Sequence, residues 1–232
     1  MKIKALLPGV LDTQEQKDMT KRALNSLVSS HDLKITEDYK KYKNKVAAVW
    51  NVFLKDKVGT EYDYLLITAN DVEHDPKCID FMVRCAQDNP KAGIISCKVT
   101  RDYSEFKKKK GKRRYTKTLT ENEPKDPATF LMPWGVIEDI GFADEQFPCE
   151  FVERDLIYRA KLAGYDWIQP DVVLEYHPPY SGTIGNPIER LQIAYQKYVA
   201  KFGGDANFEI FKYPYNDINL SYFHNEEDAS PS

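Results

Sequence analysis

The stretch LLITANDVEHDP, residues 65–76, passes from apolar residues straight into a cluster of acids, an amide and an imidazole. A turn needs one or two such residues, because Asn and Asp cap their own backbone. The number here exceeds that need, and carboxylates are the groups that coordinate hard divalent cations. The stretch therefore predicts a site of chemistry at the end of a buried strand.

Strands and helices are predicted to alternate along the first hundred residues. Apolar runs predict strands at 2–9, 33–36, 63–68 and 92–100, and helical spacing of apolar residues predicts helices at 13–29, 45–54 and 80–87. This alternation favours an α/β domain with a mostly parallel sheet flanked by helices. Ligands of such sheets lie beyond the carboxyl ends of the strands, so we expect the Pro8-Gly9 turn and the acidic cluster to face one crevice.

The second half of the chain is less regular. The segment FKKKKGKRRYTK, residues 106–117, carries eight Lys and Arg residues and predicts a mobile loop, because like charges repel. Later come a predicted helix at 154–163 ended by Gly164, a strand at 167–179 and a helix at 188–200. The last eight residues, NEEDASPS, have the composition of a disordered tail.

Composition sets limits on the class of protein. A chain of 232 residues with 42% hydrophobic residues suits one α/β domain, and a net charge of −3 does not suggest a wholesale nucleic-acid coat. The four cysteines show no CxxC spacing, so neither a zinc knuckle nor a disulfide framework is indicated, and we expect reduced, buried thiols. The sequence has no recognisable signal peptide and no stretch long enough to span a bilayer, which predicts a soluble, cytoplasmic protein without stable membrane insertion.

Four stretches, in order, resemble the large family of inverting nucleotide-sugar glycosyltransferases that includes rhamnosyl- and galactosyltransferases. KVAAVWNVFL resembles the family's helix with a central Asn, and DYLLITANDVEHDP resembles its strand followed by Asn-Asn-Asp-Val. IGFADEQFPCEFVERDLIYRAKLAGYDW is similar to the stretch that reads Gly-x-Phe-Asp-Glu, then Glu-Asp-x-Asp-Leu and Ala-Gly-Tyr. VVLEYHPPYSG resembles the closing strand with its His.

The resemblance implies a single-domain GT-A fold, which is Rossmann-like, with a catalytic domain over residues 1–185 that contains the basic loop 106–117. Residues 186–224 would form a helical and aromatic extension of that domain, before the tail 225–232. The implied activity moves a sugar, with inversion, from a nucleotide-diphosphate donor, expected to be a UDP sugar, to an acceptor hydroxyl.

A metal site follows from this resemblance. A departing diphosphate needs its charge neutralised, and Mn²⁺ or Mg²⁺ held by few protein ligands does this. Asp71 matches the metal-binding acid of the family's DxD motif, although Ala69 makes the motif incomplete. Glu73 is a candidate second carboxylate, and His177 matches the late His of the family.

An inverting transfer also needs a base beside the acceptor hydroxyl. Alignment on Asp155-Leu156 and Ala163-Gly164-Tyr165 leaves Glu153 where the family has its catalytic Asp, one methylene longer, with Val152 in place of the preceding Glu. A shifted register would make Asp155 the base instead. Both acids are also explained as charges that the amino terminus of a helix favours.

The resemblance further implies which residues contact the two substrates. For the donor these are Pro8, Gly9, Asp38, Lys45, Asn51 and Asn70, although the family's Asp-Asp-Gly-Ser after the second strand is replaced by TEDYKKYKN. Trp134 is expected to stack on a sugar of the acceptor, or else to be a core aromatic.

The basic segment bears on the acceptor. Its cations, among them Lys107, Lys108, Arg113 and Arg114, alternate with aromatic residues in a way that suits phosphate backbones and unstacked bases. A viral-type enzyme of the host cytoplasm that glycosylates hydroxymethylated pyrimidines in DNA is one specific hypothesis. An anionic lipid carrying a saccharide, and a solvated loop without a partner, are the others.

Two rival functions remain open at this point. A nucleotidyltransferase of the same fold also uses carboxylates and a metal, but LLPGVLD lacks the glycine-rich signature expected after its first strand. A non-catalytic module that binds nucleic acid or an anionic surface through the basic segment is the second rival.

Overall fold

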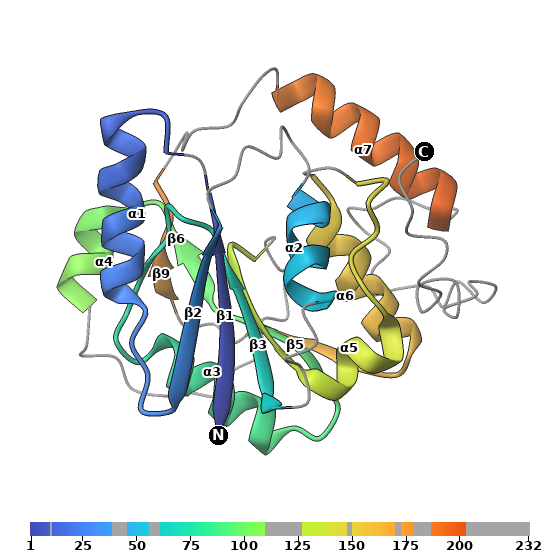
Figure 1. Ribbon diagram of the computed structural model, residues 1–232, viewed down its shortest axis with the longest axis horizontal. Helices are drawn as coiled ribbons and strands as arrows, with labels where there is room; N and C mark the ends of the chain where they lie inside the picture. The colour runs from blue at the N-terminus through green and yellow to red at the C-terminus, as the bar shows by residue number, and fades with distance from the viewer. Residues whose placement is uncertain are drawn as a thin grey trace.

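The computed structural model describes residues 1–9, 11–38, 46–55, 61–109, 127–147, 150–169, 173–178 and 187–202. Two β-sheets lie among helices (Figure 1). In chain order the elements are β1 (Lys2–Pro8), α1 (Gln14–Ser26), β2 (Asp32–Asp38), α2 (Val46–Lys55), β3 (Tyr64–Thr68), β4 (Glu73–His74), α3 (Cys78–Asp88), β5 (Ala92–Ser96), β6 (Lys98–Thr100), α4 (Tyr103–Lys109), β7 (Thr129–Pro133), α5 (Trp134–Ile140), α6 (Val152–Leu162), β8 (Asp166–Ile168), β9 (Val173–Tyr176) and α7 (Pro187–Phe202).

The larger sheet has the strand order β2-β1-β3-β7-β5-β8. β1 runs parallel to β2 and β3, and β5 runs parallel to β8, whereas β7 is antiparallel to both of its neighbours. The prediction of a mostly parallel sheet flanked by helices is confirmed. Because β1, β3 and β5 point the same way, their carboxyl ends share one edge of the sheet, which is called the carboxyl edge below.

Each face of this sheet builds its own hydrophobic core. In β1, Leu6 packs with residues of α2, α5, α6 and α7, whereas Ala5 and Leu7 pack with residues of α1 and α3. Successive side chains of a strand point to opposite faces, so one apolar strand serves both cores. In Figure 1, α1 lies on the left of the sheet and α2, α5, α6 and α7 on the right.

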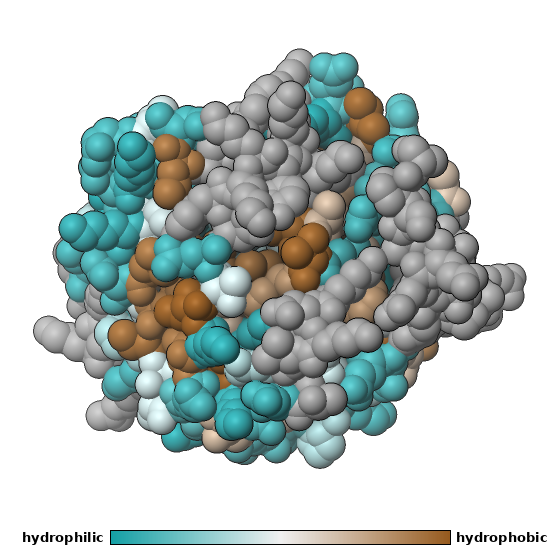
Figure 2. All heavy atoms as spheres, viewed as in Figure 1, coloured by the Kyte–Doolittle hydropathy of each residue, from teal (hydrophilic) through white to brown (hydrophobic). Residues whose placement is uncertain are grey.

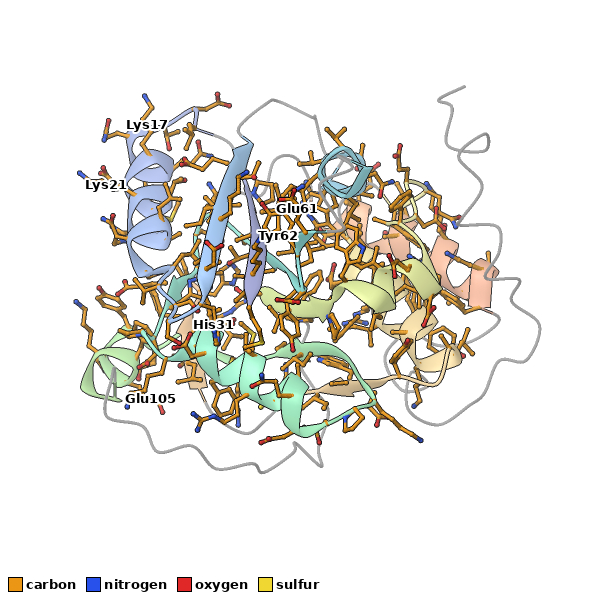
Figure 3. All side chains as sticks on the ribbon, turned by 60° about the horizontal axis from the view of Figure 1, so that its bottom comes forward. Lys17, Lys21, His31, Glu61, Tyr62 and Glu105 are labelled. Atoms are coloured by element: carbon orange, nitrogen blue, oxygen red, sulfur yellow. The ribbon has the colours of Figure 1, made fainter. Side chains whose placement is uncertain are left out.

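The predicted helices form with small shifts at their ends. α1 begins at a capping box, in which the Thr13 hydroxyl accepts from the Gln16 backbone and the Gln16 side chain accepts from the Thr13 backbone. Its outer face is polar, and Lys17 and Lys21 point away from the sheet (Figure 3). Figure 2 shows the same pattern from outside, because the surface over α1 is mainly hydrophilic while apolar side chains gather near the middle of that view.

Two predicted strands prove to be two strands each, which corrects the prediction. Residues 92–100 divide at Cys97 into β5 and β6, and residues 167–179 contain β8 and, further along, β9. β6 and β9 leave the large sheet and form a second sheet with β4, in the order β4-β9-β6. Cys97 at the break is only 1% exposed, and neither glycine nor proline stands beside it, so the sequence gives no sign of the change of sheet.

Two further segments differ from expectation. ATFLMP, for which we predicted no element, forms β7 in the middle of the sheet. The start of the basic segment is helical rather than a loop, because Phe106 of α4 is fully buried against Tyr103 and Tyr176. The residues 110–126 and the tail 225–232 lie outside the described residues.

No helix among the described residues combines the length and the apolar character that crossing a bilayer requires.

The contact between α6 and β5 provides a test of the fold. A Cβ added at Gly93 of β5 would lie 2.5 Å from the Cβ of Tyr165. Gly93→Ala should therefore lower the free energy of unfolding by about 1–3 kcal/mol, because the overpacked strand and the chain after α6 must move apart. Urea unfolding followed by circular dichroism measures this.

Gly135→Ala in α5 is the matched control, since a Cβ there meets no atom within 4 Å. We expect it to leave the stability unchanged or to raise it by up to about 1 kcal/mol, because Ala favours a helix over Gly. Equal losses in the two variants would contradict the packing described.

Candidate functional site

Asp71 and His177 meet at the carboxyl edge. Asp71 lies in the turn after β3, and His177 directly follows β9, 106 positions later. The Nε2 atom of His177 is 3.2 Å from Oδ2 of Asp71, and the two side chains are 26% and 10% exposed. The backbone N–H of His177 donates to the carbonyl of Thr100, which fixes its place beside β6. The fold thus brings together two of the three residues predicted to hold a metal.

The other oxygen of Asp71 bears on that prediction. Oδ1 is buried and has no hydrogen-bond partner among the described residues. A buried carboxylate oxygen without a partner is costly, so such atoms are rare in folded proteins. A divalent cation would satisfy it, and a carboxylate beside an imidazole is a donor set that Mn²⁺ accepts. The residues present therefore fit a metal ion at this place.

Asn70 and Gly9 hold the turn against the first strand. The amide of Asn70 donates to the hydroxyl of Thr20 in α1 at 2.8 Å. A Cβ at Gly9 would lie 2.4 Å from the Asn70 amide nitrogen, so only glycine allows the backbone after β1 to approach this side chain. Pro8 precedes it, paired with Asp38 across β1 and β2. Four predicted donor-binding residues therefore belong to the carboxyl edge, although the side chain of one of them is not described: Pro8, Gly9, Asn70 and, without its side chain, Asp38.

The remaining polar residues of the 70–75 cluster have structural partners. His74 is fully buried, its Nδ1 atom lies 3.1 Å from the Ser26 hydroxyl, and its Nε2 atom lies 2.9 Å from that of Thr129. The Asp75 carboxylate accepts from the backbone of Lys77 just before α3. These two residues join α1, β7 and α3 to the short strand β4, so the cluster serves the fold as well as the site.

Glu73 is directed toward α4. Its carboxylate accepts a hydrogen bond from the Tyr103 hydroxyl at 3.3 Å. The pKa of Lys107 is raised by its hydrogen bond to Tyr103 and by the charge of Glu73. Glu73 thus connects the strand to the first cations of the basic segment, and its metal-binding role stays a prediction.

Asn51 has a scaffolding role that the sequence did not reveal. Its carbonyl accepts from the backbone N–H of Ala143, and its amide donates to the Ala143 carbonyl and to Glu145, all within 2.9 Å. The side chain is 4% exposed, so these bonds hold the loop after α5 against α2. The structure gives Asn51 this task, and its contact with the donor stays a prediction.

Asp155 is fully buried within an ion network. Arg159 donates to it at 2.9 Å, and the ammonium of Lys201 in α7 lies 2.5 Å from its other oxygen. Arg159 also donates to the carbonyls of Ile140 and Phe142. Asp155 therefore ties α6 to α7 and to the end of α5, which is a structural role rather than the predicted catalytic one.

Glu153 lies in the first turn of α6 and is partly exposed. The chain after α6 reaches β8 at Asp166, whose backbone N–H donates to the carbonyl of Lys91, just before the amino end of β5. The 11 residues of α6 span about 16 Å. Its first turn therefore lies toward the carboxyl edge, the edge that holds Asp71.

Phe151, just before α6, has a left-handed backbone with φ of 68°. A bulky residue in that region costs about 1–3 kcal/mol, and such strain is concentrated at functional sites. The ring is buried against Tyr195 and Tyr198 of α7. No sequence pattern predicts this conformation. It sets the direction in which the chain enters α6, the helix that carries Glu153.

Trp134 is at the opposite edge of the sheet, which corrects its predicted place beside the acceptor. Its backbone N–H donates to Asp63, just before β3, and its indole donates to Glu138. β7 runs antiparallel to β3, so the carboxyl edge is about 13 Å away along the strand. Lys45, Arg113 and Arg114 lie outside the described residues, as does the side chain of Lys108.

Known proteins were compared with this chain by sequence and by fold. No family model matches it, and no curated protein matches it significantly. The fold resembles that of S. aureus TarS residues 1–349, with a TM-score of 0.52 at 12% identity, covering 88% of this chain and 72% of the other. The same TarS fragment in complex with UDP-GlcNAc gives a TM-score of 0.54, at 12% identity, covering 88% and 74%.

A longer TarS structure gives a TM-score of 0.50 at 12% identity, and the match covers 88% of this chain but only 44% of that one. At this identity the likeness concerns the fold alone.

The ion network gives a prediction in which pH matters. Burial would raise the pKa of Asp144, but the ammonium of Lys201, 2.6 Å away, and the hydrogen bonds of Lys201 and Gln146 lower it. Lys201→Met should reduce the free energy of unfolding at pH 7 by about 3 kcal/mol, because it leaves the buried Asp155 and the half-buried Asp144 short of positive charge. Thermal or urea unfolding over a range of pH measures this.

The folded pKa of Asp144 lies below its ordinary value of 3.8, so the stability that the pair contributes is present above that value. It is lost as the pH falls through the folded pKa, and the difference between the variant and the wild type should shrink there. Lys197→Met, one turn earlier and bonded to the carbonyl of Gln146, is the control and should cost under about 1 kcal/mol. A constant difference at every pH would contradict this account.

Proposed function

We propose that this protein is a glycosyltransferase that takes a sugar from a nucleotide-diphosphate donor, a UDP sugar, and depends on a divalent metal. The observation that carries the proposal is the unpartnered oxygen of Asp71 beside His177 at the carboxyl edge. The likeness in fold to TarS, which has been crystallised with UDP-GlcNAc, supports the donor class. Ligands of α/β sheets lie at this edge.

The residues divide the work as follows. Asp71 and His177 would hold Mn²⁺ or Mg²⁺, whose charge offsets that of the departing diphosphate. Pro8 and Gly9 bring the backbone of the first strand to the same edge, where the donor nucleotide would lie. Asn70 keeps the turn in place by its bond to Thr20.

Glu153 is the proposed base. The acceptor hydroxyl gives its proton to this carboxylate as its oxygen bonds to the anomeric carbon, and the bond from that carbon to the diphosphate breaks. Attack from the side opposite the leaving group inverts the anomeric centre. Partial exposure allows Glu153 to return the proton to solvent afterwards.

The acceptor is proposed to be anionic. This rests on the eight Lys and Arg residues of 106–117. Hydroxymethylated DNA is the specific candidate, and its binding should weaken steeply as salt is raised. An acceptor whose affinity does not change between low and moderate salt would argue against nucleic acid.

The donor and metal are tested together by thermal shift. We expect a UDP sugar to raise the melting temperature only when Mn²⁺ is present, and slow Mn²⁺-dependent hydrolysis of the donor in the absence of an acceptor. Asp71→Asn should abolish both effects, because it removes a metal ligand. Asp63→Asn, at the other end of β3, is the matched control and should retain them. Absence of hydrolysis and of stabilisation for every donor, with or without Mn²⁺, would favour a binding module.

Glu153→Gln tests the base. The amide keeps the size of the side chain but accepts no proton, so donor binding should persist while the rate of transfer or hydrolysis falls about 100-fold or more. Glu138→Gln, on α5 at the other edge of the sheet, should leave the rate unchanged. Steady-state rates together with the thermal shift separate the two effects, and full activity of Glu153→Gln would remove this assignment.

A further inference from the structure

Two thiols and a carboxylate meet in the interior beneath the second sheet. Cys78 begins α3, Cys97 lies between β5 and β6, and Glu175 is in β9. Their exposed fractions are 0%, 1% and 0%. One potential ligand atom from each side chain lies within 4.8 Å of the other two. None of the three takes part in the site proposed above.

The distances match those of a tetrahedral thiophilic metal. The Sγ atoms of Cys78 and Cys97 are 3.6 Å apart, and Sγ of Cys78 is 3.6 Å from Oε1 of Glu175. Zinc bonds of about 2.3 Å to sulfur and 2.0 Å to oxygen place two sulfurs about 3.8 Å apart and a sulfur and an oxygen about 3.5 Å apart. The side chains therefore need little movement to surround an ion.

A second observation points to a missing partner. Oε2 of Glu175 is buried and has no hydrogen-bond partner among the described residues. Burial raises the pKa of Glu175 well above its usual range, and it also raises that of Cys78. A buried acid with an unbonded oxygen is costly, and a cation in the cluster would remove that cost.

We propose that Cys78, Cys97 and Glu175 form a structural site for Zn²⁺. Both oxygens of Glu175 bind the ion, which gives four ligand atoms without a water molecule in a geometry distorted from tetrahedral, because the two oxygens of one carboxylate lie close together. Binding displaces the two thiol protons and the carboxyl proton to solvent. The amino end of α3 favours the negative charge of Cys78. With all three ligands buried, the site is closed, as structural zinc sites are.

The site would fasten the second sheet to the first. Cys97 is the point at which the chain leaves β5 for β6, and Glu175 precedes the segment that carries His177. An ion bound to both residues and to α3 fixes β6 and β9 against the helix. The expected effect of zinc is therefore on stability.

The test is the metal content of the full-length protein, purified without chelator and measured by mass spectrometry. We expect about one zinc per chain, and a melting temperature that falls when a chelator removes it. Replacing the ion with Co²⁺ should give a sulfur-to-cobalt charge-transfer band in the near ultraviolet, with visible bands of a four-coordinate ion. Wild-type protein with neither zinc nor this band under Co²⁺ titration would overturn the proposal, as would a disulfide between Cys78 and Cys97.

Variants locate the ion. Cys97→Ser and Glu175→Gln should each weaken zinc binding at least about tenfold, because loss of a residue that only hydrogen-bonds a ligand already lowers metal affinity by that much. Cys85→Ser, a fully buried cysteine on the same helix α3, should keep the zinc. Asp71→Asn should keep the charge-transfer band, so loss of Mn²⁺-dependent donor binding and loss of this zinc are distinguishable.

Circular dichroism checks that each variant is folded. If a folded Cys97→Ser retains full zinc and the charge-transfer band, the site is wrong. If Cys97→Ser does not fold, the wild-type Co²⁺ spectrum still decides whether thiolates bind the ion.

Discussion

The ion pairs of the buried Asp155 carboxylate hold together the three helices α5, α6 and α7, which lie on the right in Figure 1. This carboxylate is fully buried and lies between the guanidinium of Arg159 and the ammonium of Lys201. A buried ion without partners costs several kcal/mol, so these groups are stable only together. Since Arg159 also binds the end of α5, and Lys201 also binds Asp144, the network fixes α5, α6 and α7 as one unit. Glu153, two positions before Asp155, takes its place from this unit.

The other half of the candidate site depends on the second sheet. β4 and β9 pair so that His74 lies opposite Glu175, and the chain then reaches His177. His74 in turn joins this sheet to α1 and β7 through hydroxyl groups. The proposed base and the proposed metal ligands therefore belong to two separately stabilised parts, both of which lie toward the carboxyl edge. This arrangement explains why so many polar residues follow β3: Asp71 is available to a ligand, while His74 and Asp75 hold the strand that positions it.

Hydrophobic periodicity was sufficient to predict the α/β class and most helices, and the family resemblance was what assigned Asp71 and His177 to one site. Periodicity could not locate the breaks after β5 and β8, and at the first of these neither glycine nor proline marks the point where the chain changes sheet. Nor could it give the direction of β7. Because β7 runs antiparallel to β3, Trp134 lies at the edge of the sheet opposite the carboxyl edge. The scaffolding role of Asn51 could not be predicted because its partner Ala143 is 92 positions away. The cluster of Cys78, Cys97 and Glu175 could not be predicted from cysteine spacing for the same reason, since only the fold brings these residues together.

Two acids separated by a single residue show how burial determines whether a carboxylate can serve as a catalytic base. Asp155 and Glu153 have similar chemistry, and the sequence alone left both as candidates for the base. A base must accept a proton and return it to solvent in every cycle. Asp155 is 0% exposed, and both of its oxygens are bonded to cations of Arg159 and Lys201, so neither an acceptor nor solvent can reach it. Glu153 lies in the first turn of the helix and is partly exposed, so a proton accepted there can pass to solvent. Of the two acids, Glu153 is therefore the one that solvent can reach, as a base that turns over must be.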